Sequence, residues 1–214
     1  MTTVPYGPNA WMLTFADTVD DIAFERGRRI SQHLEKTPPE GLREFVMGYQ
    51  TVLLIFGEPT VKHQEWPIAE VAKTLQQSSA SKTTAAAIKE IPVTYTGPDL
   101  ERVARHNSLS CDEVVKIHCN TPYKVYVLGF APGFPYLGEL DSRIHTPRLE
   151  TPRTQVPAGS VGIGGCHTGI YPIPNPGGWN LIGTTDIRLF DPAIEEDRGK
   201  FYLHPGDKVK FVMT

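Results

Sequence analysis

Two arginines in a repeated Thr-Pro-Arg pattern are the residues best suited to bind an anion. The pattern ends once at Arg148 and again at Arg153. The proline in each triplet fixes φ in advance, so the arginine that follows it is presented at a low entropic cost. A planar guanidinium binds a carboxylate or a phosphate through two parallel hydrogen bonds. We therefore expect an anion contact, with ion pairs to Glu150 or Asp141 as the alternative.

Aromatic and proline residues cluster in the same stretch and predict the wall of a pocket. Residues 129–136 (GFAPGFPY) combine two prolines with three aromatic rings, which is typical of a stiff pocket wall or of a loop that caps a barrel. Residues 175–179 (NPGGW) form a tight turn that presents an indole. The catalytic candidates are Arg148, Arg153 and His167. The substrate-binding candidates are Phe134, Tyr136, Ser160, Thr168 and Trp179.

A glycine-rich run at residues 156–165 (VPAGSVGIGG) offers a second way to hold an anion. Its backbone N–H groups could approach a negative group closely. The run is not a P-loop, because no Gly-Lys-Ser/Thr follows, and it does not open a helix as a dinucleotide-binding fingerprint must. Tight bends between barrel strands explain these glycines equally well.

The cysteine and histidine residues predict neither a metal site nor a cysteine nucleophile. Cys166 is followed by His167, and His118 is followed by Cys119. Neighbouring residues on a strand point to opposite faces, so Cys166 and His167 are poorly placed to pair. No Cys/His spacing matches a zinc site. We expect no bound metal, and we interpret His167 as a polar residue that contacts the ligand.

Composition excludes several classes of function. The chain has 214 residues, 40% hydrophobic and 21% charged, with a formal net charge of -3. Without a Lys/Arg block it has no electrostatic footprint for nucleic acid. No apolar run approaches the roughly 18 residues of a membrane span, and the first 17 residues do not resemble a signal peptide. Three cysteines without CxxC spacing indicate a cytoplasmic protein with no disulfide framework.

The first 95 residues predict a ferredoxin-like α+β domain. A Thr18/Asp21 capping box begins a helix that ends before Pro38, and a second helix starts at Pro67 and precedes a polar loop over residues 78–84. The order strand–helix–strand–strand–helix–strand is the ferredoxin-like arrangement. The expected strands are residues 11–16, 44–49, 51–56 and 91–95.

A helical hairpin is expected at the start of a second domain, residues 96–214. Asp99 and Ser110 are good N-caps, and Ser110 forms a capping box with Glu113. Two short helices with a tight turn imitate a DNA-binding helix-turn-helix. The second helix, however, offers only Lys116 as a base and has acidic residues at its N-terminus, where a phosphate would bind. We therefore expect the hairpin to pack on a β-structure.

The remainder of the chain predicts a closed β-structure. Proline and glycine interrupt it too often for long helices. Many short strands joined by Gly/Pro turns point to a barrel or a sandwich, which makes the whole chain α+β. The expected strands are residues 125–128, 180–182, 187–190 and 209–212.

Five motifs in order carry a family resemblance, dense over residues 91–214. They are residues 129–137 (GFAPGFPYL), 152–163 (PRTQVPAGSVGI), 168–172 (TGIYP), 176–179 (PGGW) and 189–192 (LFDP). The sequence resembles the family of the 5-oxoprolinase B subunit, also called allophanate hydrolase subunit 1, KipI, or carboxyltransferase subdomain C and D.

This resemblance implies a ferredoxin-like N-terminal domain followed by a cyclophilin-like β-barrel. It implies two partners, a C subunit of the allophanate hydrolase subunit 2 type and a separate A subunit. Such a complex opens the lactam of 5-oxo-L-proline to L-glutamate with ATP and Mg²⁺, and the chain would be inactive alone. Because a lactam is a poor electrophile, phosphorylation of its carbonyl oxygen would activate it. Positioned cations such as Arg148 and Arg153 would stabilise the moving charge.

Two positions depart from the family pattern and leave the substrate open. His167 stands where a Gln is expected, and Thr184 stands where many members have an Arg. The loss of that Arg removes an anion contact. The same barrel also serves half of a biotin-dependent urea or allophanate-type carboxyltransferase, and a KipI-like inhibitor of a sensor histidine kinase. Both stay open as alternatives, whereas the cyclophilin likeness implies no prolyl isomerase activity.

Overall fold

The computed structural model describes residues 1–57, 88–196 and 199–214. The helix expected from Pro67 and the loop expected at residues 78–84 lie outside the described residues. The chain divides into two compact units, Met1–Thr83 and Thr84–Thr214, and each is described by itself. Within the described residues, no helix is long and apolar enough to cross a bilayer.

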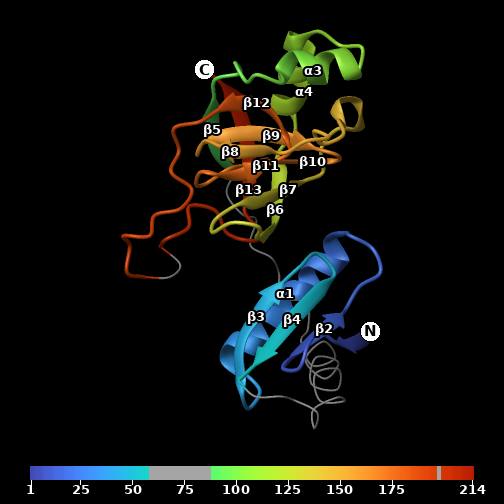
Figure 1. Ribbon diagram of the computed structural model, residues 1–214, viewed down its shortest axis with the longest axis vertical. Helices are drawn as coiled ribbons and strands as arrows, with labels where there is room; N and C mark the ends of the chain where they lie inside the picture. Colours follow the sequence, from blue (N-terminus) through green and yellow to red (C-terminus); the bar gives the residue numbers. More distant parts are fainter. Residues whose placement is uncertain (58–87, 197–198) are drawn as a thin grey trace. The chain divides into compact units, whose positions relative to one another are not determined.

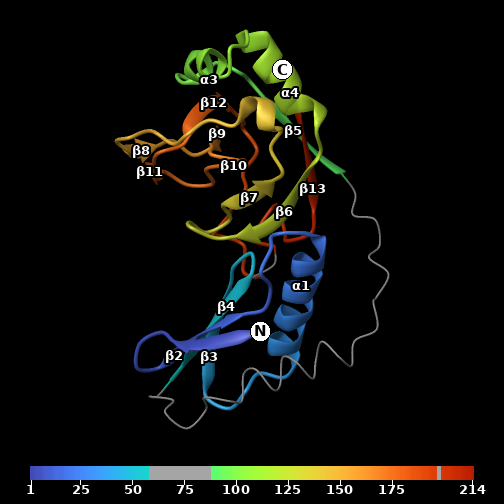
Figure 2. The same cartoon turned by 90° about the vertical axis from the view of Figure 1, so that its right-hand side faces the viewer.

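The first unit is an antiparallel sheet covered on one face by a helix (Figure 2). Helix α1 (Asp21–Lys36) buries Ile30 and Leu34 in one cluster with Leu13 and Leu54 of the sheet. The helix ends before the two prolines, as predicted. The strands, in the order β1-β2-β4-β3, are β1 (Thr2–Pro5), β2 (Ala10–Thr14), β4 (Thr51–Phe56) and β3 (Leu42–Met47).

The N-cap of α1 differs from the expected one. Asp20, not Thr18, is the cap: its backbone is extended and its carboxylate accepts a hydrogen bond from the Ala23 N–H at 2.7 Å. Thr18 instead donates its hydroxyl to the Asp20 carboxylate at 2.7 Å. A carboxylate next to the first helical residue satisfies an orphan N–H group directly and carries the charge that the positive helix end favours.

The last strand expected in the first domain pairs elsewhere. Strand β5 (Ile88–Val93) runs parallel to β13 (Lys208–Met213) in the sheet of the second unit. In the first unit, β1 occupies the edge next to β2, which is the place that a ferredoxin-like arrangement gives to its fourth strand. Parallel pairing of distant segments leaves no local signal, so the sequence pattern alone could not assign β5 to its sheet.

The second unit is built on a nearly closed seven-stranded sheet (Figure 1). An isolated bridge between Thr94 and Thr184 joins the two ends of the row, because Thr94 follows β5 and Thr184 ends β12 (Asn180–Thr184). A separate two-stranded ribbon consists of β8 (Arg153–Val156) and β11 (Asn175–Gly177). Between β12 and β13 the row contains β9 (Ser160–Gly164), β10 (His167–Ile170), β7 (Pro135–Gly138) and β6 (Tyr123–Leu128).

One expected strand is absent from this sheet. Residues 187–190 are irregular apart from an isolated bridge between Phe190 and Phe201. The Ile187 N–H bonds to the Thr185 hydroxyl at 3.3 Å, a local contact that competes with strand pairing. The other three strands expected here lie within β6, β12 and β13.

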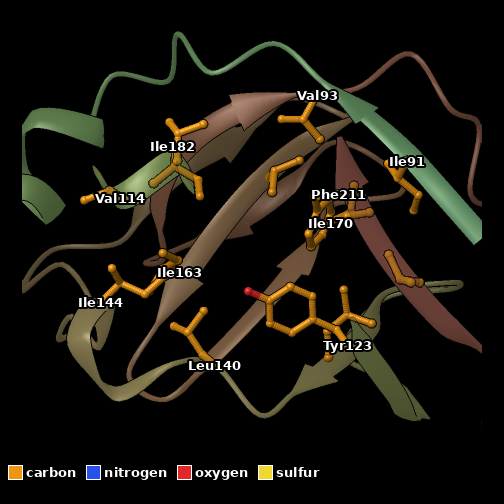
Figure 3. Packing of buried hydrophobic residues seen from close by; sticks show 14 of the residues in the cluster. Ile91, Val93, Val114, Tyr123, Leu140, Ile144, Ile163, Ile170, Ile182 and Phe211 are labelled. Carbon is orange, nitrogen blue, oxygen red and sulfur yellow. The ribbon is translucent and has the colours of Figure 1, made fainter. Parts of the chain in front are cut away.

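Branched aliphatic side chains fill the interior of the seven-stranded sheet (Figure 3). Ile91, Ile163 and Ile170 are fully buried there. The expected helical hairpin is present as α3 (Leu100–His106) and α4 (Cys111–Asn120), which pack on β12 and β13. Figures 1 and 2 show both helices at one end of the sheet. The Ser110/Glu113 capping box of α4 is formed as predicted.

Candidate functional site

The second unit contains a cavity of about 310 Å³, and half of its lining residues are aromatic. Phe134, Tyr171 and Trp179 belong to one hydrophobic cluster and are each at most 5% exposed. A cavity of this size and lining suits a small molecule with an apolar face and one or two polar groups. The lining residues are Phe130, Phe134, Tyr136, Arg148, Pro152, Tyr171, Pro176, Gly177, Gly178 and Trp179.

Edge-to-face contacts hold the aromatic walls in place. Phe134 is central: its ring centroid lies 5.1 Å from Tyr136, 5.2 Å from Tyr171 and 5.4 Å from Trp179. The interplanar angles of 63° to 83° are the geometry that the aromatic quadrupole favours. Each ring restrains its neighbours, so the cavity is preformed before a ligand arrives.

Phe130 forms an exposed rim beside this cluster. It is 60% exposed, and its φ of 68° places it in the left-handed region that non-glycine residues rarely adopt. A turn holds it there, since the Phe134 N–H bonds to the Ala131 carbonyl and the Gly129 N–H bonds to the Phe134 carbonyl. Its ring meets Phe134 edge-on at 5.4 Å. The strained backbone thus presents an apolar ring at the mouth of the cavity.

Gly164 of the predicted anion loop and Gly177 of β11 leave space for these rings. A side chain at Gly164 would place its Cβ 2.5 Å from the Trp179 Nε1 atom, and one at Gly177 would collide with the Tyr171 hydroxyl. Strand β9, which contains Gly164, pairs with both β10 and β12. Its backbone therefore belongs to the sheet ladder, and the structure supports the barrel explanation of this run.

Arg148 is the cationic residue of the cavity lining. Its guanidinium lies 5.8 Å from the centre of the Trp179 ring, within cation–π range. Among the residues that the structure describes, no carboxylate forms an ion pair with it. Burial raises the pKa of Tyr136, and the charge of Arg148 acts in the opposite direction. Arg148 therefore brings an uncompensated positive charge to an aromatic cavity.

Arg153 is placed differently from Arg148 although both end a Thr-Pro-Arg triplet. Its Nη2 atom donates to both carboxylate oxygens of Asp99 at 2.8 Å, and its Nη1 atom donates to the Trp179 carbonyl at 3.3 Å. Arg153 is not among the lining residues of the cavity. The alternative for this arginine was an ion pair with Glu150 or Asp141. Arg153 instead pairs with Asp99, and Asp141 pairs with Arg143 at 2.7 Å.

His167 is half-buried at the start of β10, outside the residues that line the cavity. Burial lowers its pKa, and the charges of Arg148 and His145 lower it further. The imidazole is therefore neutral at physiological pH. In this state it can both donate and accept a hydrogen bond in the electrostatic neighbourhood of Arg148.

Thr168 and Ser160 are directed to the interior rather than to the cavity. Thr168 is fully buried and bonds to His118, whereas Ser160 is 2% exposed and pairs with Thr184 in the β9–β12 register. Thr184, where the family pattern is broken, thus lies at the closure of the sheet beside Thr94. Of the eight predicted site residues, the cavity brings together four: Phe134, Tyr136, Arg148 and Trp179.

A buried hydrogen-bond chain, here called the His118 cluster, contains Thr168, His118, Tyr95 and Cys119. Thr168 donates to the Gly162 carbonyl at 3.1 Å, so it accepts from His118 Nε2 at 2.8 Å. His118 Nδ1 then accepts from the Tyr95 hydroxyl at 2.7 Å, and Tyr95 accepts from the Cys119 thiol at 3.3 Å. Burial lowers the pKa of His118 to about 3 and raises the pKa of Tyr95.

The six lining residues that were not among the predicted site residues are Phe130, Pro152, Tyr171, Pro176, Gly177 and Gly178. All six lie within the recognised motifs, but a motif does not say which of its residues share a cavity. The described residues contain no group of three or more His, Cys, Asp or Glu side chains arranged to hold a metal ion.

Comparisons with known proteins agree over nearly the whole chain. The model of the family described as carboxyltransferase domain, subdomain C and D, matches residues 1–198. The 5-oxoprolinase B subunit of Escherichia coli O157:H7 is 42% identical over 209 residues, which cover 96% of this chain and 93% of that protein. The 5-oxoprolinase B subunit of Bacillus subtilis (strain 168) is 38% identical over 218 residues, covering 96% and 90%.

Solved structures show the same fold within longer chains. A crystal structure of TTHA0988 superposes with a TM-score of 0.80 at 36% identity and covers 96% of this chain but 40% of that one. The Kluyveromyces lactis urea carboxylase superposes with a TM-score of 0.77 at 21% identity, covering 99% of this chain and 21% of that one. This chain therefore spans a minor part of both proteins, and the second likeness concerns the fold alone.

Proposed function

The chain belongs to the family of carboxyltransferase domains, subdomain C and D, and on this premise we propose that it is the B subunit of an ATP-dependent 5-oxoprolinase. The complex would cleave 5-oxo-L-proline to L-glutamate with ATP hydrolysis. Support comes from two relatives named as the B subunit of 5-oxoprolinase, each aligned over at least 90% of its own length. The partners in this proposal are the C and A subunits of the enzyme, and the chain alone would be inactive.

The cavity supplies the observation that carries the proposal. Arg148 extends over Trp179 with no carboxylate partner among the described residues, at the wall of an aromatic cavity of about 310 Å³. 5-Oxo-L-proline has one carboxylate and a small lactam ring. We propose that Arg148 binds the carboxylate and that the ring packs against Phe134 and Trp179. This uses a charge-assisted hydrogen bond for orientation and apolar contact for the ring.

The other predicted site residues take supporting roles in this proposal. His167 would be a neutral polar neighbour of Arg148, because burial lowers its pKa and the electrostatic effects of Arg148 and His145 lower it further. Arg153, Ser160 and Thr168 would shape the site from behind. The side chains of Arg153 and Thr168 bond to Asp99 and His118, and Ser160 is buried where β9 pairs with β12.

The cavity does not fit MgATP on its own. Its lining residues include one cation, Arg148, and no carboxylate that could ligate Mg²⁺. We therefore place ATP use at the level of the complex and derive no phosphoryl-transfer step from this chain. A ferredoxin-like first unit and a cyclophilin-like second unit stay part of the proposal. So does a cytoplasmic location, which the three free cysteines support.

Reconstitution tests the proposal directly. The chain is combined with its two partner subunits, and ADP and L-glutamate are measured with and without 5-oxo-L-proline. We expect ADP release that depends on 5-oxo-L-proline and on the presence of this chain. The matched pair of variants is Arg148→Ala and Arg143→Ala, because Arg143 is an exposed arginine that pairs with Asp141 away from the cavity lining.

Three results would contradict the proposal. Absence of 5-oxoproline-dependent ADP release in the complete complex would contradict the proposed 5-oxoprolinase activity. Inhibition by avidin together with dependence on a urea-like substrate would favour the biotin-dependent carboxyltransferase. Inhibition of a sensor histidine kinase by this chain alone would favour the regulatory function. Equal loss in the Arg143→Ala and Arg148→Ala complexes would instead remove the specific role of Arg148.

A further inference from the structure

We propose that α3, together with the residues at its two ends, positions the guanidinium of Arg148 and the indole of Trp179, and that Asp99, Arg102 and Arg153 are positioning residues for ligand binding. This inference rests on the proposed function for its ligand. It concerns side chains outside the cavity lining, which reach the cavity through the segments that carry its walls.

The first connection runs from Asp99 to the Trp179 segment. Asp99 stands at the N-cap position of α3, yet its side chain makes no capping hydrogen bond to the helix. Its carboxylate instead accepts from Arg153 at 2.8 Å and from the Leu181 N–H at 2.7 Å. Arg153 also donates to the Trp179 carbonyl at 3.3 Å. The Asp99–Arg153 ion pair therefore binds the backbone on both sides of Asn180, at the Trp179 carbonyl and at the Leu181 N–H.

The second connection runs from Arg102 to the Arg148 segment. Arg102 donates to the side-chain oxygen of Asn180 and to the Pro147 carbonyl at 3.2 Å. Asn180 donates to the same Pro147 carbonyl at 3.0 Å and to the Ile163 carbonyl at 2.9 Å. The residue directly before Arg148 is therefore fixed by two donors, and Asn180 links it to the residue directly after Trp179.

A third contact comes from the other end of the helix. Asn107, the C-cap residue of α3, donates to the Thr146 hydroxyl at 3.1 Å. Thr146 is fully buried and pairs with Gly165 in an isolated bridge. The Leu149 N–H bonds to the Gly178 carbonyl at 2.7 Å on the other side of Arg148. The backbone on both sides of Arg148 is therefore tied down, while its own side chain stays available.

These contacts converge on the one geometry that the proposed ligand needs. Arg148 and Trp179 face each other at 5.8 Å, and each belongs to a segment that α3 holds through charged or amide side chains. Buried charged networks are costly, and hydrophobic replacements of similar volume are often as stable. A charged network next to the cavity has a functional explanation if it sets the distance between a cation and a ring to within a fraction of an ångström.

The test compares two half-buried ion pairs of the same unit. Asp99→Asn and Arg153→Lys change the pair at the cavity. Asp207→Asn changes a matched pair, because Asp207 binds Lys89 at 2.8 Å and also accepts from a backbone N–H, at His204. In the reconstituted complex we expect the first two variants to raise KM for 5-oxo-L-proline about tenfold with kcat within about twofold, and Asp207→Asn to leave KM unchanged.

A double variant separates positioning from general destabilisation. If Arg102 acts through Arg148, then adding Arg102→Gln to Arg148→Ala raises KM no further than Arg148→Ala alone, because coupled residues are not additive. A KM that rises in the double variant by the full single-variant factor would overturn the inference. So would an Asp207→Asn complex whose KM rises as much as that of Asp99→Asn.

A spectroscopic readout makes the inference independent of the reaction. The chain is labelled with 5-fluorotryptophan, and the ¹⁹F resonance of Trp179 is assigned with Trp179→Phe. We expect Asp99→Asn and Arg153→Lys to shift or broaden this resonance and Asp207→Asn to leave it in place. An unchanged Trp179 resonance in the first two variants would overturn the inference. If the unmodified complex did not turn over 5-oxoproline, the proposed function would be overturned. The comparison of the Trp179 resonance between the variants would still test the positioning role.

Discussion

The aromatic cavity and the His118 cluster lie in the same unit and both contain aromatic side chains, but they treat their polar groups in opposite ways. In the His118 cluster, each polar side chain from Thr168 to Cys119 has a partner within hydrogen-bond distance. In the cavity, Arg148 lies over the face of Trp179 and forms no ion pair with a carboxylate of the described residues. Satisfied polar groups stabilise a core, whereas a charge without a partner is available to a ligand.

Strand β10 separates the two regions. His167 and Thr168 are neighbours on this strand, and the alternation of side chains sends them to opposite faces. Thr168 enters the His118 cluster, and His167 lies where Arg148 lowers its pKa. A residue's place in a sequence motif therefore says less about its role than the face of the strand on which it lies.

The largest expected effect is on stability, from His118→Ala. The change leaves Thr168 and Tyr95 without their partner and removes a ring that stacks on Phe211 at 4.5 Å. We expect a loss of about 3 to 5 kcal/mol in the free energy of unfolding, from the cavity and the unpaired groups together. Urea denaturation measures it. An unchanged midpoint would show that the cluster does not stabilise the core.

Arg148→Ala should have the converse effect, on binding and not on stability. Removal of a charge-assisted hydrogen bond to the ligand carboxylate costs about 2 to 3 kcal/mol, so KM for 5-oxo-L-proline should rise by roughly 30- to 150-fold. The free energy of unfolding should change by less than about 0.5 kcal/mol, because the side chain is exposed. A large loss of stability in Arg148→Ala with an unchanged KM would show that Arg148 stabilises the fold and does not bind the ligand.

The pH dependence of stability should come from the His118 cluster. The pKa of His118 is lowered from 6.5 to about 3 by burial, so between these values the unfolded chain binds more protons than the folded one. Stability is therefore complete above pH 6.5 and falls as the pH decreases, by about 2 kcal/mol between pH 7 and pH 5. The His118→Gln protein has no imidazole to titrate at this position, so its free energy of unfolding should decrease less as the pH falls. If the free energy of unfolding changed equally with pH in both proteins, this pH dependence would not come from His118.

The smallest effect is expected from Ser110→Ala. Ser110 caps α4, the helix that carries His118, and its hydroxyl accepts from the Glu113 N–H at 3.2 Å. Loss of this cap should cost about 1 kcal/mol of stability and leave KM for 5-oxo-L-proline unchanged. Thermal unfolding and steady-state kinetics on one preparation measure both quantities. A change in KM would indicate that α4 also acts on the cavity.

Much of the local structure followed from the sequence. Helix α1 ends before Pro38, the Ser110/Glu113 box caps α4, and strand β4 covers residues 51–56 as expected. The expected cap at Thr18 and the expected strand at residues 187–190 were wrong. In both cases a short-range polar contact, at Asp20 and at Thr185, competed successfully with the pattern.

The repeated Thr-Pro-Arg triplets show what the sequence by itself determined and what it could not. Their residue types drew attention to the stretch that contributes Arg148 to the cavity lining, and the motifs around them placed the chain in its family. Only the tertiary structure separated Arg148 from Arg153, because Asp99 lies 54 residues away from Arg153 along the chain and closes on it only when the sheet forms. Propensity and spacing act over a few residues, whereas the pairing of a buried charge depends on which distant segments share a face.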